Sequence, residues 1–326
     1  MKDTTAWPDL SGPSAQSTVQ TLHLWTQVVG KTRLALAPMV NHWWNVTFRV
    51  TPRGLTTRAI PYASRTFDVE FDLIDHELVI RSSTGGSERF ELKEGSVAAF
   101  HQRYFAALRR LGIEVSIYPR AVEIPETIWL DSDLTHREYD PDWAHHFFVA
   151  LIAADRALCE FRSGFLGKVS PVQFFWGGLD LAVTRFSGRQ APLHPGGFPN
   201  VPDYVMWEAY SHEVSSAGFW PGDARYPQPA FYSYAYPEPP GFSHVRVEPD
   251  AAGYEPSLGE FVLPYSAVRA ARSPQREVRA FLNGTYAAAA EFAHCDRAAL
   301  EREAHDRSLR TPQASGHAPA WRGAEQ

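Results

Sequence analysis

Cysteine is scarce in this chain, which holds only Cys159 and Cys295 among its 326 residues. Two thiols cannot build the disulfide framework on which small secreted domains depend. Both lie in segments with helical periodicity, so we expect buried, reduced thiols. The first residues, MKDTTAWPDLSGPS, also lack the apolar stretch of a secretory signal. Together these features predict a cytoplasmic protein.

An excess of basic charge and long apolar runs are missing as well. The formal net charge is -6, and no basic stripe runs along the sequence, so nucleic acid is not an expected partner. No apolar run reaches the ~20 residues that a membrane-spanning helix needs, so a membrane is not expected either. Hydrophobic residues make up 44 % of the chain, which is enough for a sizeable core.

The familiar catalytic and cofactor motifs are also absent. The sequence has no Gly-x-Gly-x-x-Gly, no Walker A loop, no Gly-x-Ser-x-Gly, no His-Glu-x-x-His and no Cys-x-x-Cys. Dinucleotide-binding, nucleotide-binding, α/β-hydrolase and zincin classes therefore lose their usual support. Metal, cofactor and oligomeric state stay open.

Hydrophobic periodicity predicts an α+β fold. Alternation of apolar and polar residues, with short turns between, indicates an antiparallel meander of strands at 44–50, 55–60, 67–73, 78–81 and 90–92. Asp68, Glu70 and Asp72 share one face of a strand, which is either a solvated face paired with Arg49 and Arg81 or a cation site. Amphipathic stripes predict long helices that cover the sheet. The first begins after a capping box at Ser17 and ends at Gly30, and the other three lie at 96–112, 140–164 and 273–292.

The later part of the chain predicts further strands at 174–186, 231–236 and 260–263, and a short helix through Trp207, Tyr210 and Val214. Gly177-Gly178 suggests a bulge or the close approach of another group. We expect a flexible N-terminus at 1–16, a single domain at 17–302 and a disordered tail at 303–326. Gly-Lys pairs at 30–31 and 167–168 raise the possibility of two related halves, 17–125 and 126–302, or of a chance repetition.

Polar and aromatic residues concentrate between Ser211 and Gly241. From Phe198 to Phe242 the chain has 12 aromatic residues in 45, against 13 % overall. Large rings around a few polar groups are typical of small-molecule sites. The candidate catalytic residues are His212 as a base, with Glu208 or Glu213 as its orienting partner or a metal ligand. The simpler interpretation is a surface pair on a helix.

Candidate ligand-binding residues lie around this stretch. Arg185 could hold an anion or could form an internal ion pair. Asp180, in an otherwise apolar strand, needs a partner if it is buried, and an internal ion pair is the simpler interpretation there too. His194, in a His-Pro-Gly-Gly segment, is a candidate lid residue or part of a plain turn. Rings that could form the walls of a site, or simply pack in a core, complete the set: Trp44, Trp220, Tyr232 and Tyr234.

Three phrases carry a resemblance to a known family. They are HWWN at 42–45, GKVSP at 167–171 and SHEVSSAGFWPG at 211–222. With them the chain resembles a family of bacterial proteins of unknown function of this length, over about Thr21 to Glu301. The resemblance implies one full-length domain in a bacterial cytoplasm. It implies no activity, cofactor or catalytic residue.

Two functions follow from these patterns. The first is a small-molecule site between the halves, which in an enzyme would perform hydrolysis or another acid–base reaction. The second is a non-catalytic interaction module that uses the Pro- and aromatic-rich stretch 211–241 as a binding surface. The burial of the aromatic residues distinguishes these two hypotheses, because a small-molecule site needs a cleft and a docking surface needs exposed rings.

Overall fold

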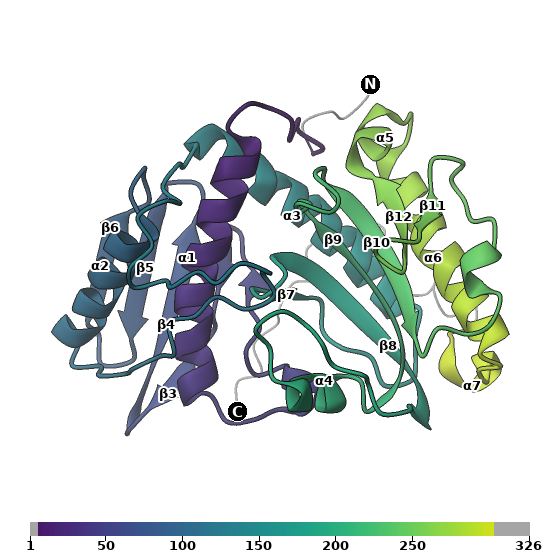
Figure 1. Ribbon diagram of the computed structural model, residues 1–326, viewed down its shortest axis with the longest axis horizontal. Helices are drawn as coiled ribbons and strands as arrows, with labels where there is room; N and C mark the ends of the chain where they lie inside the picture. The colour runs from purple at the N-terminus through teal and green to yellow at the C-terminus, as the bar shows by residue number, and fades with distance from the viewer. Residues whose placement is uncertain (1–5, 303–326) are drawn as a thin grey trace, which may run out of the picture.

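The computed structural model describes residues 6–302 and confirms the α+β prediction (Figure 1). Within these residues, seven α-helices accompany two antiparallel sheets of six strands each. The predicted disordered tail, 303–326, lies outside the described residues. Trp7 and Leu10 are buried, so the core already includes part of the segment 1–16 that we expected to be flexible. The Trp7 ring packs against two core rings, Phe231 and Tyr265, at 6.2 and 5.9 Å between centroids.

The first sheet is the predicted meander. Its strands pair in the order β1-β2-β4-β5-β6, and β3 adds to β4. The predicted strand at 44–50 is wrong except at its end, because a short 3-10 turn (η1, Asn41–Trp43) leads into it. The bounds are β1 (Arg49–Val50), β2 (Gly54–Thr56), β3 (Ile60–Tyr62), β4 (Arg65–Asp72), β5 (Glu77–Ser82) and β6 (Ser87–Glu91).

One face of this sheet is apolar and covered, as the alternation predicts. Phe67, Val69 and Phe71 are buried. Helix α2 (Val97–Arg110) lies against them, with the Phe100 ring stacked on Phe71 at 6.2 Å between centroids. The α2 N-terminus is the predicted one, because the Ser96 hydroxyl accepts the backbone N–H of Ala99.

The other face carries the acidic residues of β4, paired across the sheet. Arg81 bridges Asp68 and Glu70 at 3.2 and 2.7 Å. Asp72 pairs with Arg53 instead of the expected Arg49. The predicted pairing with arginines is therefore confirmed, but the expected solvated face is wrong for Glu70 and Asp72, because both are buried.

Helix α1 (Ala15–Leu36) differs from its prediction at both ends. It begins two residues before Ser17, and the hydroxyl of its first flanking residue, Ser14, donates to Asp140 Oδ2 at 2.5 Å. It also continues through Gly30. A Cβ at Gly30 would lie 2.4 Å from the Trp176 ring. This glycine therefore leaves space for the Trp176 indole and does not end the helix.

The second sheet runs in the order β11-β12-β10-β9-β8-β7, all antiparallel. Helices α3 (Pro141–Ser163) and α6 (Pro274–Phe292) pack on one of its faces, and α1 lies towards the first sheet (Figure 1). Core rings such as Phe219 and Phe231 point to the side of the helices. The bounds are β7 (Gln173–Phe175), β8 (Asp180–Gln190), β9 (His212–Trp220), β10 (Ala230–Tyr236), β11 (Gly253–Glu255) and β12 (Glu260–Pro264).

The predicted short helix is only partly right. Helix α4 (Asp203–Ala209) ends before Tyr210, and the chain then enters β9, which the sequence did not predict. The remaining short elements are η2 (Phe242–His244), α5 (Tyr265–Ala270) and α7 (Arg297–Leu300). Cys159 is exposed and Cys295 half-buried, so the prediction of buried thiols is wrong.

The two sheets meet at Phe48 and Phe174. Each donates its backbone N–H to the other's carbonyl, at 2.9 and 3.0 Å. A long helix precedes each sheet, which fits the two proposed halves. The two Gly-Lys pairs are not equivalent, however, because 30–31 lies inside α1 and 167–168 lies in a connection before β7.

Candidate functional site

The second sheet has one face that no long helix covers. This open face carries the side chains that alternate with the core rings, including Asp180, Thr184 and Tyr232. Two connections pass over it. One is the segment 113–139 and the other is the loop 191–202. They are tied together, since Glu123 N–H donates to the Pro199 carbonyl at 2.8 Å and Asn200 donates to Ile124 at 2.8 Å.

Carboxyl groups from separate parts of the chain gather at one end of this face. The Tyr232 hydroxyl donates to Asp180 Oδ2 at 2.5 Å. A Cβ built on Gly178 would lie 2.8 Å from Asp180 Oδ1 and 3.6 Å from Glu123 Oε2, so both carboxyl groups reach the same point. Glu260 is close enough for the charge of Asp180 to influence it. We call Glu123, Asp180, Glu260 and Tyr232 the carboxyl cluster.

Glycines make room for this cluster. A Cβ on Gly177 would lie 2.0 Å from Glu123 Oε1, and one on Gly218 would lie 2.5 Å from the Tyr232 hydroxyl. A Cβ on Gly218 would also lie 2.3 Å from the backbone carbonyl of Leu181 and cannot fit, whereas one on Gly177 requires the Glu123 carboxyl to move away. The prediction that Gly177-Gly178 admits another group is therefore confirmed, and the group is the Glu123 carboxyl.

Desolvation sets the charge of the cluster. Burial, helped by the negative charge of Asp180, raises the pKa of Glu123 to about 7 and that of Glu260 to about 8. Burial also raises the pKa of Asp180 to about 6, although the bond from Tyr232 favours its ionised form. Glu123 as a whole residue is nevertheless exposed to solvent. We call the space above Gly177 and Gly178, which the Glu123 and Asp180 carboxyl groups fill, the recess.

Tyrosines extend the cluster along the sheet. The Tyr232 and Tyr234 rings lie 6.2 Å apart and nearly parallel, and the hydroxyls of Tyr234 and Tyr210 lie 2.8 Å apart. Beside them, the Thr184 and Ser216 hydroxyls bond at 2.9 Å. Burial raises the pKa of all three tyrosines, so each phenol stays neutral and can donate a hydrogen bond.

Helix α1 holds the glycine turn from the opposite side. His23 Nε2 donates to the Gly177 carbonyl at 2.8 Å. Burial lowers the pKa of His23 to about 4, so this ring is neutral near pH 7. It therefore adds a fixed hydrogen bond next to the carboxyl cluster and no charge.

The three residues expected to be catalytic do not come together. Glu208 lies on α4, and His212 is the first residue of β9, so the predicted helical pair does not form. Glu213 points to the opposite face from His212 and pairs with Arg189 at 2.7 Å. His212 lies six residues along β9 from Gly218, the partner of Tyr232, or about 20 Å at ~3.3 Å per residue.

Arg185 faces the helices and not the open face. Its guanidinium lies 3.5 Å from the centre of the Phe161 ring and 4.2 Å from that of Tyr286, and it donates to the Phe161 carbonyl. A cavity of about 240 Å³ lies beside it, also lined by Glu301. An anion at the carboxyl cluster is thus out of reach of Arg185.

The predicted wall residues divide into two groups. Asp180, Tyr232 and Tyr234 do come together, and the His194 ring stacks on Tyr210 at 4.7 Å next to them. Trp220 lies at the end of β9 and stacks on Tyr226 at 5.7 Å. Trp44 lies elsewhere, near Lys168.

The sequence reasoning missed Glu123 and Glu260. Glu123 lies in a connection without periodicity, so nothing in its surroundings pointed to a site. The only signal was indirect, in the glycine pair that its carboxyl approaches. Glu260 begins β12, where we predicted a strand and gave its first residue no role.

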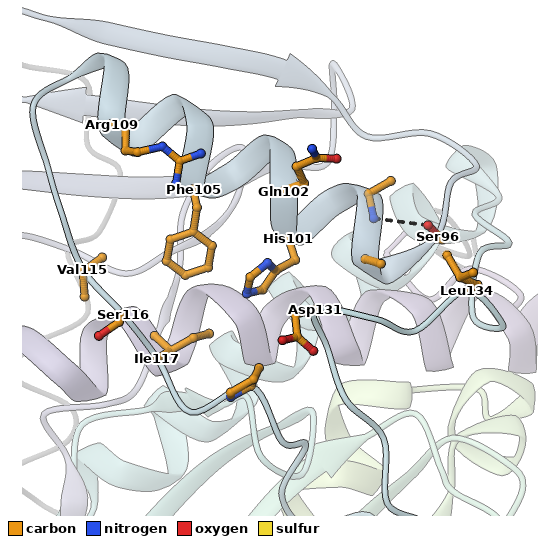
Figure 2. Close-up of a pocket in the computed structure, with 13 residues that line it drawn as sticks. Ser96, His101, Gln102, Phe105, Arg109, Val115, Ser116, Ile117, Asp131 and Leu134 are labelled. Atoms are coloured by element: carbon orange, nitrogen blue, oxygen red, sulfur yellow. Dashed lines mark hydrogen bonds between the residues drawn. The ribbon is translucent and has the colours of Figure 1, made fainter.

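A larger cavity, of about 640 Å³, lies between α2 and the segment 113–139 (Figure 2). His101 and Asp131 point towards each other across it, and the His101 ring lies 4.6 Å from that of Phe105. Burial lowers the pKa of His101, and Asp131 partly offsets this. The cavity is wide, but its titratable residues are one half-buried histidine, His101, and the exposed Arg109 and Asp131. The enclosed titratable groups lie at the carboxyl cluster instead.

Metal ligation has no ready site in the part of the chain that the structure describes. No group of three or more His, Cys, Asp and Glu side chains there is arranged to hold a metal ion. Residues 6–302 also include no helix long and apolar enough to cross a membrane.

Fold and site together define an α+β protein whose enclosed carboxyl and tyrosine groups meet on the open face of an antiparallel sheet. The chain belongs to the family of unknown function DUF5996, whose model matches residues 7–302. No curated protein and no solved structure matches it.

Proposed function

We propose that the protein is an enzyme that performs acid–base chemistry on an uncharged small molecule at the carboxyl cluster. The observation that carries this proposal is the meeting of Glu123 and Asp180 above Gly178, in a recess that raises the pKa of both carboxyl groups towards neutral pH. A catalytic acid or base works best when its pKa lies near the operating pH. Purely structural carboxylates are more often paired with a cation.

The different pKa values suggest separate roles. Glu260, with a pKa of about 8, keeps its proton at pH 7 and can act as an acid. Asp180, with a pKa of about 6, is ionised at that pH and can act as a base, steadied by the Tyr232 hydroxyl. Neighbouring carboxyl groups whose environments separate their pKa values are a recurrent acid–base arrangement.

The chemistry of the walls favours a hydroxyl-bearing ligand. Carboxyl and phenol groups donate and accept hydrogen bonds, as a sugar or polyol requires. The nearly parallel Tyr232 and Tyr234 rings offer an apolar surface to a flat or cyclic molecule. An anionic ligand would meet negative charge with little compensation, so we propose hydrolysis of a neutral glycoside-like bond.

A panel of p-nitrophenyl glycosides tests this proposal. We expect hydrolysis by the wild type, a pH profile with limbs near pH 6 and 8, and a fall in kcat of about 100-fold or more in Asp180→Asn. Glu213→Gln is the matched control, because its carboxylate pairs with Arg189 on the other face. Equal activity of Asp180→Asn and Glu213→Gln, or no hydrolysis of any member, would count against the proposal.

The interaction-module hypothesis receives less support. Residues 212–220 and 230–236 of the stretch 211–241 form two central strands, β9 and β10, and its large apolar side chains are buried or half-buried. Phe219 and Phe231 are fully buried, and Tyr232 is 8 % exposed. Rings in such positions stabilise the sheet and line the recess, and they are not available to another chain.

A further inference from the structure

A basic group lies at the other end of the open face. Lys168 Nζ and His42 Nε2 are 2.6 Å apart, and the His42 and His212 rings lie 6.0 Å apart, edge to face. We call these residues the Lys168 cluster. It brings together the segments 42–45, 167–171 and 211–222, which are far apart in the sequence.

Hydrogen bonds define the charge of this cluster. His42 Nδ1 donates to the Ala209 carbonyl at 3.1 Å, so its proton is on Nδ1 and its lone pair is on Nε2. Nε2 can then accept only from the Lys168 ammonium. Lys168 is therefore the charged partner, and His42 is neutral and 5 % exposed.

No carboxylate in residues 6–302 forms an ion pair with Lys168. Its ammonium lies instead over the rings of Phe186 and Trp44, at 4.7 and 5.6 Å from their centres. Its backbone is fixed as well, because the Lys168 carbonyl accepts the N–H of Phe186 at 3.0 Å. A lysine held against rings and an imidazole leaves two N–H donors for a ligand.

The turn that presents His42 is strained. His42 and Trp43 have φ values of 60° and 61°, in the left-handed region that bulky residues avoid. Such conformations persist where the surrounding structure holds them, and they are frequent at ligand sites. Here the turn holds the imidazole under the ammonium.

We propose that the Lys168 cluster binds the phosphate group of a small molecule. The ammonium is a compact point charge of the kind that holds phosphate, and a tetrahedral oxyanion can accept from Lys168 and from His212 Nε2, which has no bond within the described residues. Asp180 and Phe186 are six residues apart on β8, about 20 Å at ~3.3 Å per residue. The phosphate site is therefore separate from the carboxyl cluster.

Titration of the full-length protein with inorganic phosphate tests this site, followed by ¹⁵N NMR of the histidine side chains. We expect saturable shifts of His42 and His212 in the wild type. Lys168→Gln, which retains much of the stem over Trp44, should weaken the affinity at least tenfold, and a thermal melt should confirm that it folds. Lys93→Ala is the matched control, because Lys93 is exposed and pairs with Glu91.

Two further measurements test whether the site prefers phosphate over another anion and whether it is independent of the carboxyl cluster. Acetate at the same ionic strength should bind clearly more weakly than phosphate, and equal affinity would overturn the phosphate assignment. Asp180→Asn should bind phosphate with the affinity of the wild type, because the phosphate site does not depend on the carboxyl cluster. The same affinity in wild type and Lys168→Gln, or no saturable shift, would overturn the proposal.

Discussion

At the scale of single residues, the carboxyl cluster depends on glycines as much as on acids. The Glu123 carboxyl occupies the space that a side chain at Gly177 would fill. Asp180 is reached by Tyr232 only because Gly218 has no Cβ in the path of the phenol. The Glu123 carboxyl and the Tyr232 hydroxyl therefore each occupy space that a missing side chain leaves free.

Gly177→Ala tests this dependence. The new Cβ would lie 2.0 Å from Glu123 Oε1 and would displace this flexible carboxyl, so we expect a loss in the free energy of unfolding at the low end of overpacked sites, about 1 kcal/mol. Gly253→Ala is the control, because no atom lies within 4 Å of its Cβ position. The double variant Glu123→Ala/Gly177→Ala should recover much of the loss. A loss unchanged by removal of Glu123 would contradict the proposed clash.

Glu260 should make stability depend on pH. Burial raises its pKa from 4.5 to about 8, so the folded chain keeps a proton that the unfolded chain has released. Its contribution to stability is fully present below pH 4.5 and is lost as the pH rises through 8. The difference in free energy of unfolding between wild type and Glu260→Gln should therefore fall from pH 5 to 9.

Urea denaturation across that pH range measures the difference directly. His23 contributes with the opposite sign, because its lowered pKa makes stability fall as the pH drops towards 4. It is present in both proteins and cancels. A difference that stays constant with pH would show that Glu260 titrates normally.

Residue patterns predicted the cluster only in part. Gly177-Gly178 indicated a close approach, and Asp180 in an apolar strand indicated a buried group that needs a partner. Tyr232 was singled out as a wall residue, and it proves to be that partner. Glu123 could not be found, because its position follows from the path of a connection that no periodicity describes.

At the scale of elements, local patterns failed where contacts distant in the sequence decide the structure. Trp207, Tyr210 and Val214 have helical spacing, yet the helix ends at Ala209. Strand β9 forms because β8 and β10 pair with it on both sides. In the same way, α1 continues through Gly30 because the Trp176 ring packs there. Neither partner is visible in the local sequence.

Phe48 joins the two sheets, so its removal should weaken the whole fold. Its side chain is fully buried and stacks on Phe174 at 6.4 Å, and its backbone forms the bridge between β1 and β7. Phe48→Ala should cost about 3–5 kcal/mol in the free energy of unfolding. Phe198→Ala, at a ring that is 40 % exposed, should cost much less. Equal denaturation midpoints for the two variants would contradict this role.

At the scale of the whole molecule, the candidate site is assembled from five parts of the chain. Helix α1 supplies His23, the segment 113–139 supplies Glu123, and the second sheet supplies Asp180 from β8, Tyr232 from β10 and Glu260 from β12. The two connections that cover the open face are fixed to each other by Glu123 and Asn200. The antiparallel sheets and their helices were predictable from periodicity. The recess was not, because it exists only once these parts have packed together.

¹³C NMR titration of the Asp and Glu side chains tests whether the recess raises the pKa of the carboxyl cluster. Asp180→Asn, Glu123→Gln and Glu260→Gln assign the signals. Because the groups interact, the titration yields apparent pKa values for the cluster as a unit. We predict three carboxyl signals that titrate between about pH 6 and 8. Titration of all three near pH 4, as for ordinary surface carboxyl groups, would contradict the account.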